Sequence, residues 1–137
     1  MYIQPYLFFD GRCQEALDYY VSALGAKVEM AMKFKDSPEP PDQKMAQVSG
    51  DNIMHASFRI GDSVVMASDG FGKGKPVFQG VSLSLTVNSV AEADRYFSAL
   101  AKGGTIQQAL TKTFFAPSFG MVTDKFGVPW MVIAGDK

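Results

Sequence analysis

The sequence is poor in the residues from which disulfides and metal centres are made. Its 137 residues include one cysteine, Cys13, and one histidine, His55. A single cysteine excludes an internal disulfide and a four-cysteine zinc site. A single histidine excludes a metal centre with two histidine ligands from one chain.

An excess of charge and long apolar runs are also missing. The 13 basic and 14 acidic residues give a net charge of −1, so no basic surface is expected for a nucleic acid backbone. No segment approaches the roughly 18 consecutive apolar residues of a membrane helix, and the first ten residues lack the pattern of a signal peptide. We therefore expect a cytoplasmic protein with neither a nucleic acid nor a membrane partner.

Bulky apolar residues are plentiful, with 11 Phe and 5 Tyr in a chain that is 47% hydrophobic. A domain of this length buries about two-thirds of the surface that its unfolded chain exposes. The composition therefore predicts one structural domain with a substantial core.

The chain repeats itself at an offset of about 77 residues, since residues 4–28 align with residues 81–106. Each copy starts with a strand-like run and continues into an amphipathic helical pattern. Each helical pattern stops at glycine, Gly25 in the first copy and Gly103 in the second, as a left-handed C-terminal cap favours.

Strand-like segments follow each helix. In the first copy they are residues 27–34, 45–48, 54–60 and 63–68, and in the second copy residues 105–110, 120–123 and 130–133. The order predicts an α+β fold of two β-α-β-β-β modules, residues 1–69 and 80–137. The glycine-rich residues 70–79 are expected to link them.

Two of the predicted strands alternate between apolar and polar residues. Ser82 and Ser84 lie opposite leucines and valines in one strand, and His55, Ser57 and Arg59 lie opposite apolar residues in the other. If these polar faces line a common concave surface, the protein has a pocket built from sheet. The alternative is a solvated sheet face.

The polar side chains include candidates for chemistry. His55 could act as a general base or as a donor to a ligand, and Arg59 could hold a carboxylate or phosphate. The alternative for His55 is a hydrogen-bonded structural role. Cys13, at a helix start beside Arg12, could be a reactive thiolate or a small packed residue.

Aromatic residues gather near the C-terminal end of the chain. Phe114 lies in a predicted loop, and Trp130 and Met131 lie in a predicted strand. These side chains could stack on a flat or apolar ligand. They could equally form the core or a dimer interface.

Residues 54–69, 90–104 and 119–132, together with the repeat, resemble the PhnB-like branch of the glyoxalase/bleomycin-resistance/extradiol-dioxygenase superfamily, also called vicinal oxygen chelate proteins. The resemblance covers nearly the whole chain. It implies a curved, mostly antiparallel sheet around a cavity, often completed across a dimer. PhnB-like sequences are sometimes labelled ubiquinone methyltransferases, but this chain is too short for a doubly wound nucleotide-binding fold.

Metal-using members of the superfamily carry His and Glu on the first and last strands of each module. By position these sites fall near Pro5 and Ser82, near Met131, and near Val65 or Met66. None of these is a usual ligand for a hard divalent ion. The resemblance and the missing ligands together favour a protein that uses no catalytic metal and no cofactor.

The sequence therefore predicts a homodimeric small-molecule-binding protein of the vicinal oxygen chelate fold. The alternative is a lyase, isomerase or dioxygenase-type enzyme that uses His55 or an unrecognised divalent metal. The expected pocket residues are His55, Ser57, Arg59, Ser82, Ser84, Phe114, Trp130 and Met131.

Overall fold

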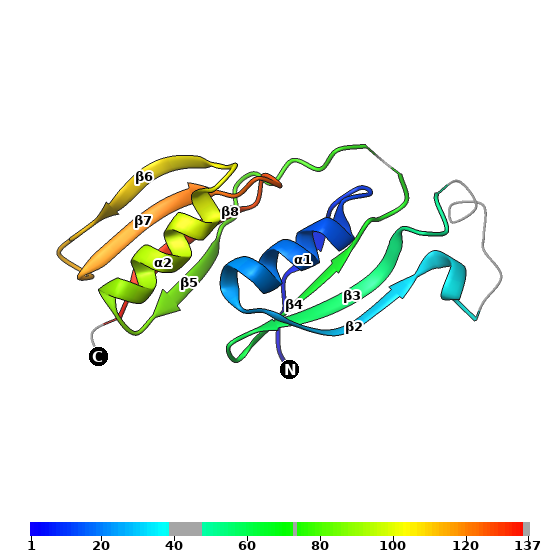
Figure 1. Cartoon of the computed structure of the whole chain (residues 1–137), viewed down its shortest axis with the longest axis horizontal. Coiled ribbons are helices and arrows are strands. Elements are labelled where there is room, and N and C mark those ends of the chain that lie inside the picture. Colours follow the sequence, from blue (N-terminus) through cyan, green and yellow to red (C-terminus); the bar gives the residue numbers. More distant parts are fainter. Residues whose placement is uncertain (39–47, 73, 136–137) are drawn as a thin grey trace. The chain divides into compact units, whose positions relative to one another are not determined.

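The computed structural model describes residues 1–38, 48–72 and 74–135. The chain divides into two compact units, Met1–Pro76 and Val77–Lys137. Within the described residues, each unit contains one α-helix and one four-stranded sheet (Figure 1).

The first unit consists of β1 (Tyr6–Phe8), α1 (Cys13–Leu24), β2 (Lys27–Lys33), the short 3-10 helix η1 (Phe34–Asp36), β3 (Ile53–Ile60) and β4 (Ser63–Ser68). Its strand order is β1-β4-β3-β2. β1 runs parallel to β4, and the other neighbours are antiparallel.

The second unit consists of β5 (Leu83–Val87), α2 (Val90–Ala101), β6 (Thr105–Thr111), β7 (Ser118–Thr123) and β8 (Pro129–Ala134). Its strand order, β5-β8-β7-β6, repeats that of the first unit. Even the irregularity of the edge strand recurs, because the register shifts between Val28 and Met30 in β2 and between Ile106 and Gln108 in β6. The predicted β-α-β-β-β repeat is confirmed.

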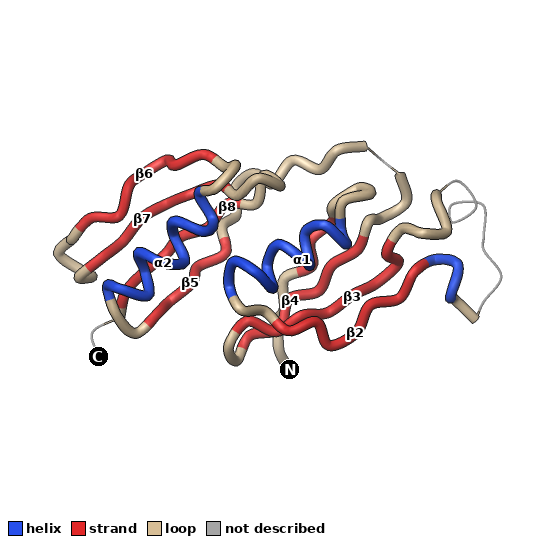
Figure 2. Tube along the Cα trace, in the orientation of Figure 1, coloured by secondary structure: helices blue, strands red, loops and turns tan. Residues whose placement is uncertain are grey.

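The predicted α+β fold class is confirmed. The eight strands of the described residues form two four-stranded sheets, and neither closes into a barrel (Figure 2). Each has one parallel pair at its edge. The helix carries the chain back along the sheet, so that the second strand runs in the same direction as the first, and two antiparallel turns then bring the fourth strand parallel to both. The enclosed cavity and the module boundaries at 69 and 80 stay predictions.

One expected segment lies mostly outside the described residues. Of the predicted strand 45–48, only Val48 is described, and it lies in a bend.

The helices bury the apolar stripes that their sequences predict. In α1 the buried side chains include Ala16, Leu17 and Tyr20, and the Tyr20 ring stacks on Phe58 of β3 with centroids 5.5 Å apart. The helix ends at Gly25, whose φ of 68° is left-handed, a conformation that glycine adopts without steric cost. α1 therefore covers the face of the first sheet on which Phe58 lies.

The two helices begin differently. At the start of α2 the Ser89 hydroxyl accepts a hydrogen bond from the Glu92 backbone N–H at 3.1 Å, a local N-cap. The residue before α1, Arg12, makes no side-chain cap. Its place is taken by Asp69, which follows β4 and whose Oδ1 accepts hydrogen bonds from the N–H groups of Gly11 and Cys13.

Candidate functional site

The first sheet has a second face, opposite α1, which we call the open face. Strand alternation turns Leu7, Ala56, Phe58 and Ala67 toward the helix and their neighbours the other way. The side chains of the open face include Tyr6, Phe8, Met30, Met32, His55, Ser57, Arg59, Met66 and Ser68.

Four of these side chains form a row across the sheet. Tyr6 is paired with Met66, Met66 with Ser57, and Ser57 with Met30. Tyr6 is 37% exposed and Met30 40% exposed, so apolar surface stays uncovered. Covering this apolar surface would be favourable, because each apolar Å² removed from water contributes about 25 cal/mol.

His55 lies beside this row and pairs with Tyr6, the first member of the row. The Tyr6 hydroxyl and His55 Nδ1 are 2.8 Å apart, and the ring of Phe8 stacks on Tyr6 with centroids 5.0 Å apart. Ser68 is the next residue across from His55 in the β3–β4 register, and it is buried. Burial raises the pKa of Tyr6 above its ordinary value, and the Ser68 hydroxyl acts in the opposite direction. The phenol is therefore neutral at physiological pH.

The second sheet repeats the row with different side chains. Ser84 is paired with Met131, Met131 with Met121, and Met121 with Gln108. Met131 therefore occupies the position of Met66, and Ser84 that of Tyr6. The same register puts Phe119 at the position of His55, so the second unit has no equivalent of the tyrosine–histidine pair.

The structure brings the expected pocket residues together in two groups. His55 and Ser57 share the open face of the first sheet, and Ser84 and Met131 are neighbours on the corresponding face of the second. Ser82 lies just before β5.

Three expected residues have other partners or surroundings. Arg59 shares the strand face of His55 and Ser57, and its Nε donates to Glu29 at 3.0 Å. Trp130 is 3% exposed and faces away from its neighbour Met131, and its Nε1 donates to the buried carboxylate of Asp124 at 2.9 Å. Phe114 is fully exposed and packs edge-on against Phe115.

Cys13 is buried in the structure, with no exposed surface. Desolvation, and then the negative charge of Asp69, raise the pKa of its thiol from 9.0 to about 12. The thiol is therefore protonated at neutral pH, which favours the packing role over the reactive one.

Alkylation should test this environment directly. At pH 8 we expect iodoacetamide to label Cys13 in the folded protein about 1,000-fold or more slowly than in urea, measured by mass spectrometry. Equal labelling rates in both states would contradict the burial.

The same pKa shift predicts a pH dependence of stability. Because folding raises the pKa of the Cys13 thiol, its contribution to the free energy of unfolding should be fully present below pH 9. That contribution should fall as the pH rises toward 12, by at most about 1.4 kcal/mol per pH unit. Cys13→Ala should show a smaller alkaline loss, because the raised pKa of Tyr6 still contributes above pH 10.

The described residues offer no ligand set for a hard divalent ion. The described residues contain no group of three or more His, Cys, Asp or Glu side chains able to hold a metal. At the positions where the superfamily places ligands, Met66 and Met131 offer only thioether sulfur, a soft and weak donor.

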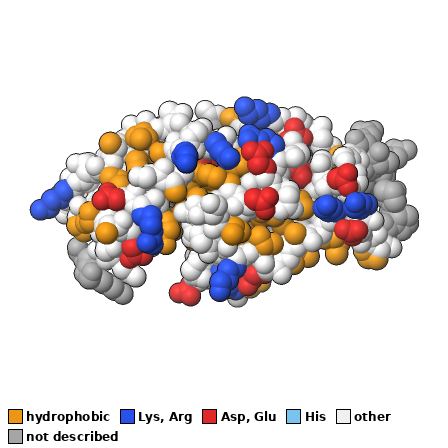
Figure 3. All heavy atoms as spheres, in the orientation of Figure 1, with side chains coloured by type: hydrophobic (Ala, Val, Ile, Leu, Met, Phe, Trp, Pro, Cys, Tyr) orange, Lys and Arg blue, Asp and Glu red, His pale blue; other side chains and the backbone are white. Residues whose placement is uncertain are grey.

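Two further observations concern the surface charge and the helices. On the side of the molecule drawn in Figure 3, basic and acidic side chains are interspersed. Neither helix in the described part of the chain is long and apolar enough to cross a membrane.

The paired β-α-β-β-β units have the fold of the glyoxalase/bleomycin-resistance proteins. A glyoxylase/bleomycin resistance protein/dioxygenase domain from Frankia sp. EAN1pec shares the fold, with a TM-score of 0.67 over 99% of this chain and 98% of that one, at 16% identity. The model of the 3-demethylubiquinone-9 3-methyltransferase family matches residues 1–133, and the chain belongs to that family.

Relatives at higher identity cover nearly the whole chain or all of it. Protein YjdN of Escherichia coli K12 is 41% identical over 96% of this chain and 94% of its own. Protein PA1353 of Pseudomonas aeruginosa is 46% identical, with a TM-score of 0.86 over 100% and 99% of the two chains. A PhnB protein from Bacillus cereus, described as a putative 3-demethylubiquinone-9 3-methyltransferase, is 26% identical, with a TM-score of 0.79 over 98% and 100%.

Proposed function

We propose that the protein binds a small organic molecule on the open face of the first sheet, without a divalent metal. The observation that carries the proposal is the partly exposed row of Tyr6, Met66, Ser57 and Met30. Small-molecule sites are mostly apolar surfaces with a few placed polar groups, and this face has that composition.

Methionine makes this face adaptable. Its side chain is unbranched and polarisable, so Met30, Met32 and Met66 can repack around aromatic or aliphatic ligands of different shape. The aromatic rings of Tyr6 and Phe8 supply a flat surface at one edge.

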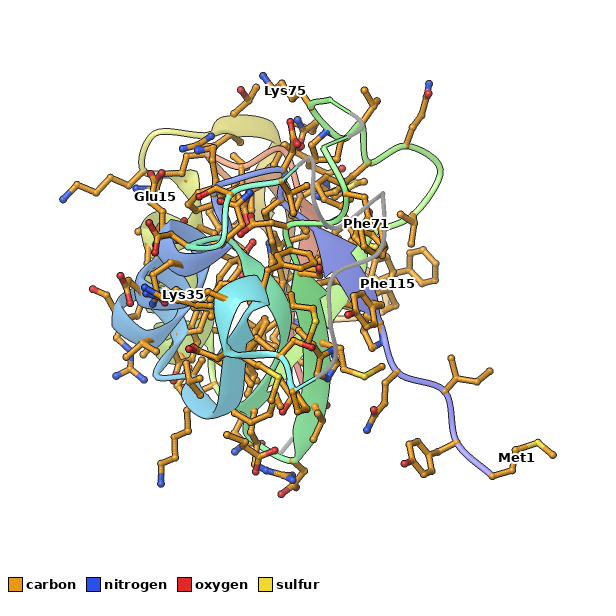
Figure 4. All side chains as sticks on the ribbon, turned by 90° about the vertical axis from the view of Figure 1, so that its right-hand side faces the viewer. Met1, Glu15, Lys35, Phe71, Lys75 and Phe115 are labelled. Atoms are coloured by element: carbon orange, nitrogen blue, oxygen red, sulfur yellow. The ribbon has the colours of Figure 1, made fainter. Side chains whose placement is uncertain are left out.

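The methionine methyl groups make the proposal testable. In protein labelled with 13C at the methionine methyls, aromatic fragments should shift the signals of Met30, Met32 and Met66, with EDTA present. The signal of Met1, at the end of the extended N-terminal segment (Figure 4), is the internal control. A screen in which bound fragments shift none of the three signals contradicts the proposal.

The claim that the site needs no divalent metal is tested separately, by the effect of Mn²⁺ on the methionine signals. Mn²⁺ is paramagnetic and broadens signals of nearby groups, so a metal site on these sheets would broaden Met66 or Met131. We expect both line widths to stay unchanged at stoichiometric Mn²⁺. Selective broadening of either signal would overturn this claim.

A second candidate is acid–base catalysis by His55, which the hydrogen bond to Tyr6 favours because it fixes the ring. Deuterium exchange into a bound carbonyl compound in D₂O, lost in His55→Ala, would identify such an enzyme. The homodimer and the cytoplasmic location stay predictions from the sequence.

A further inference from the structure

We propose that the Tyr6–His55 pair is the polar end of this site and that the ligand is a small organic acid with an apolar body. Its carboxylate accepts a hydrogen bond from His55 Nε2, and its body lies along Met66 and Met30. The inference rests on the proposed function and adds the chemical class of the ligand.

The direction of the Tyr6–His55 hydrogen bond follows from the two groups. The Tyr6 hydroxyl and His55 Nδ1 are 2.8 Å apart, and a neutral phenol is a better donor than acceptor toward an imidazole nitrogen. When the phenol donates to Nδ1, the hydrogen of the neutral imidazole is on Nε2. His55 then offers a donor to a ligand, and it still does so when the ring is cationic.

The charges around the pair favour an anion. β1, β3 and β4 contain no Asp or Glu. The one acidic residue of β2, Glu29, is held by Arg59 at 3.0 Å. On the four strands of this sheet a cationic ligand would therefore find only the carboxylate that Arg59 already holds, whereas a carboxylate would find an N–H donor and the Ser57 hydroxyl two residues along the same strand.

The apolar row sets the size of the ligand. Adjacent strands are about 4.8 Å apart, so Met66 on β4 and Met30 on β2, on either side of β3, are about 10 Å apart. That length accommodates a carboxylate attached to one or two rings. Biphenyl-4-carboxylate is a suitable probe, and biphenyl-4-carboxamide and 4-phenylbenzylamine have the same body with neutral and positive ends.

The experiment uses the full chain, without a histidine tag, labelled with 15N at histidine. Since His55 is the only histidine, its ring signals need no further assignment. We expect the 15N shifts to report the Nε2–H tautomer and the carboxylate to move the Nε2 signal. His55→Ala should weaken binding of the carboxylate about 10- to 100-fold, the usual loss of a hydrogen bond to a charged group.

Tyr6 is a positioning residue, and its test is spectroscopic. Tyr6→Phe keeps the ring but removes the hydroxyl, so we expect the His55 15N shifts to move toward a mixture of tautomers, with weaker binding of the carboxylate. Tyr2→Phe, at an exposed position, is the matched control and should change neither. Unchanged tautomer signals in Tyr6→Phe would overturn the positioning role.

The three probes separate this inference from the proposed function. If the carboxylate, amide and amine bind with equal affinity and all three shift the Met30 and Met66 signals, the inference that the ligand is an organic acid is wrong. The proposed binding site on the open face is then still supported. Probes that bind without shifting either methionine, or do not bind at all, would overturn both. His55→Gln retains an N–H donor and should recover part of the affinity lost in His55→Ala.

Discussion

Replacing Asp69 with alanine is expected to lower the free energy of unfolding by about 4 kcal/mol. The Asp69 side chain is buried, and its oxygens accept hydrogen bonds from the N–H groups of Gly11, Cys13 and Ile53 at 2.7–2.8 Å. Alanine leaves three donors without their acceptor, and each stranded buried donor costs about 1–3 kcal/mol. Urea unfolding followed by circular dichroism measures the change.

Asp94→Ala on the exposed side of α2 is the matched control and should stay within about 0.5 kcal/mol of the parent. Asp69→Asn should be intermediate, because one oxygen remains while the new NH₂ group faces a donor. A loss under 1 kcal/mol in Asp69→Ala would contradict the capping role. Asp69→Ala should also disturb the proposed binding site on the open face, because Asp69 accepts a hydrogen bond from Ile53 at the start of β3, two residues from His55.

Gly104→Ala is expected to destabilise the second unit by about 3 kcal/mol or more. A Cβ at this position would overlap the backbone carbonyl oxygen of Thr123 and lie 3.0 Å from the Asp124 Cα. Both are backbone atoms, so β7 would have to shift, and overpacking of this kind costs about 1–3 kcal/mol or more.

Gly135→Ala provides the control for this substitution. Its Cβ would lie 3.4 Å from the Val87 carbonyl oxygen, an ordinary contact, so we expect a change within about 0.5 kcal/mol. Thermal unfolding of both variants measures the difference. Equal melting temperatures for the two variants would contradict the close approach at Gly104.

Periodic features of the fold could be predicted from the sequence because they are local. The alternation of Leu83 and Leu85 with Ser84 is confirmed by pairing with buried Trp130 and Val132 on one face and Met131 on the other. The same alternation separates Trp130 from Met131, since adjacent residues of a strand face opposite ways. The pocket expected from the sequence included both residues, although adjacent positions of one strand do not share a face.

The tyrosine–histidine pair was missed for a different reason. The repeat alignment at about 77 residues places Tyr6 on Leu83, which lies on the helix side of its sheet. In the structure Tyr6 corresponds to Ser84, because the connection into α1 is longer than that into α2. A slip of one residue moves a side chain to the other face. The pairing of β1 with β4, which joins Tyr6 to His55 across 49 residues, leaves no local pattern.

Intermolecular NOEs from biphenyl-4-carboxylate to the methionine methyl groups test the central claim most directly. Ligand binding on the open face of the first sheet predicts NOEs from the ring protons to the methyls of Met30 and Met66. NOEs from the bound probe to other parts of the chain alone would contradict it.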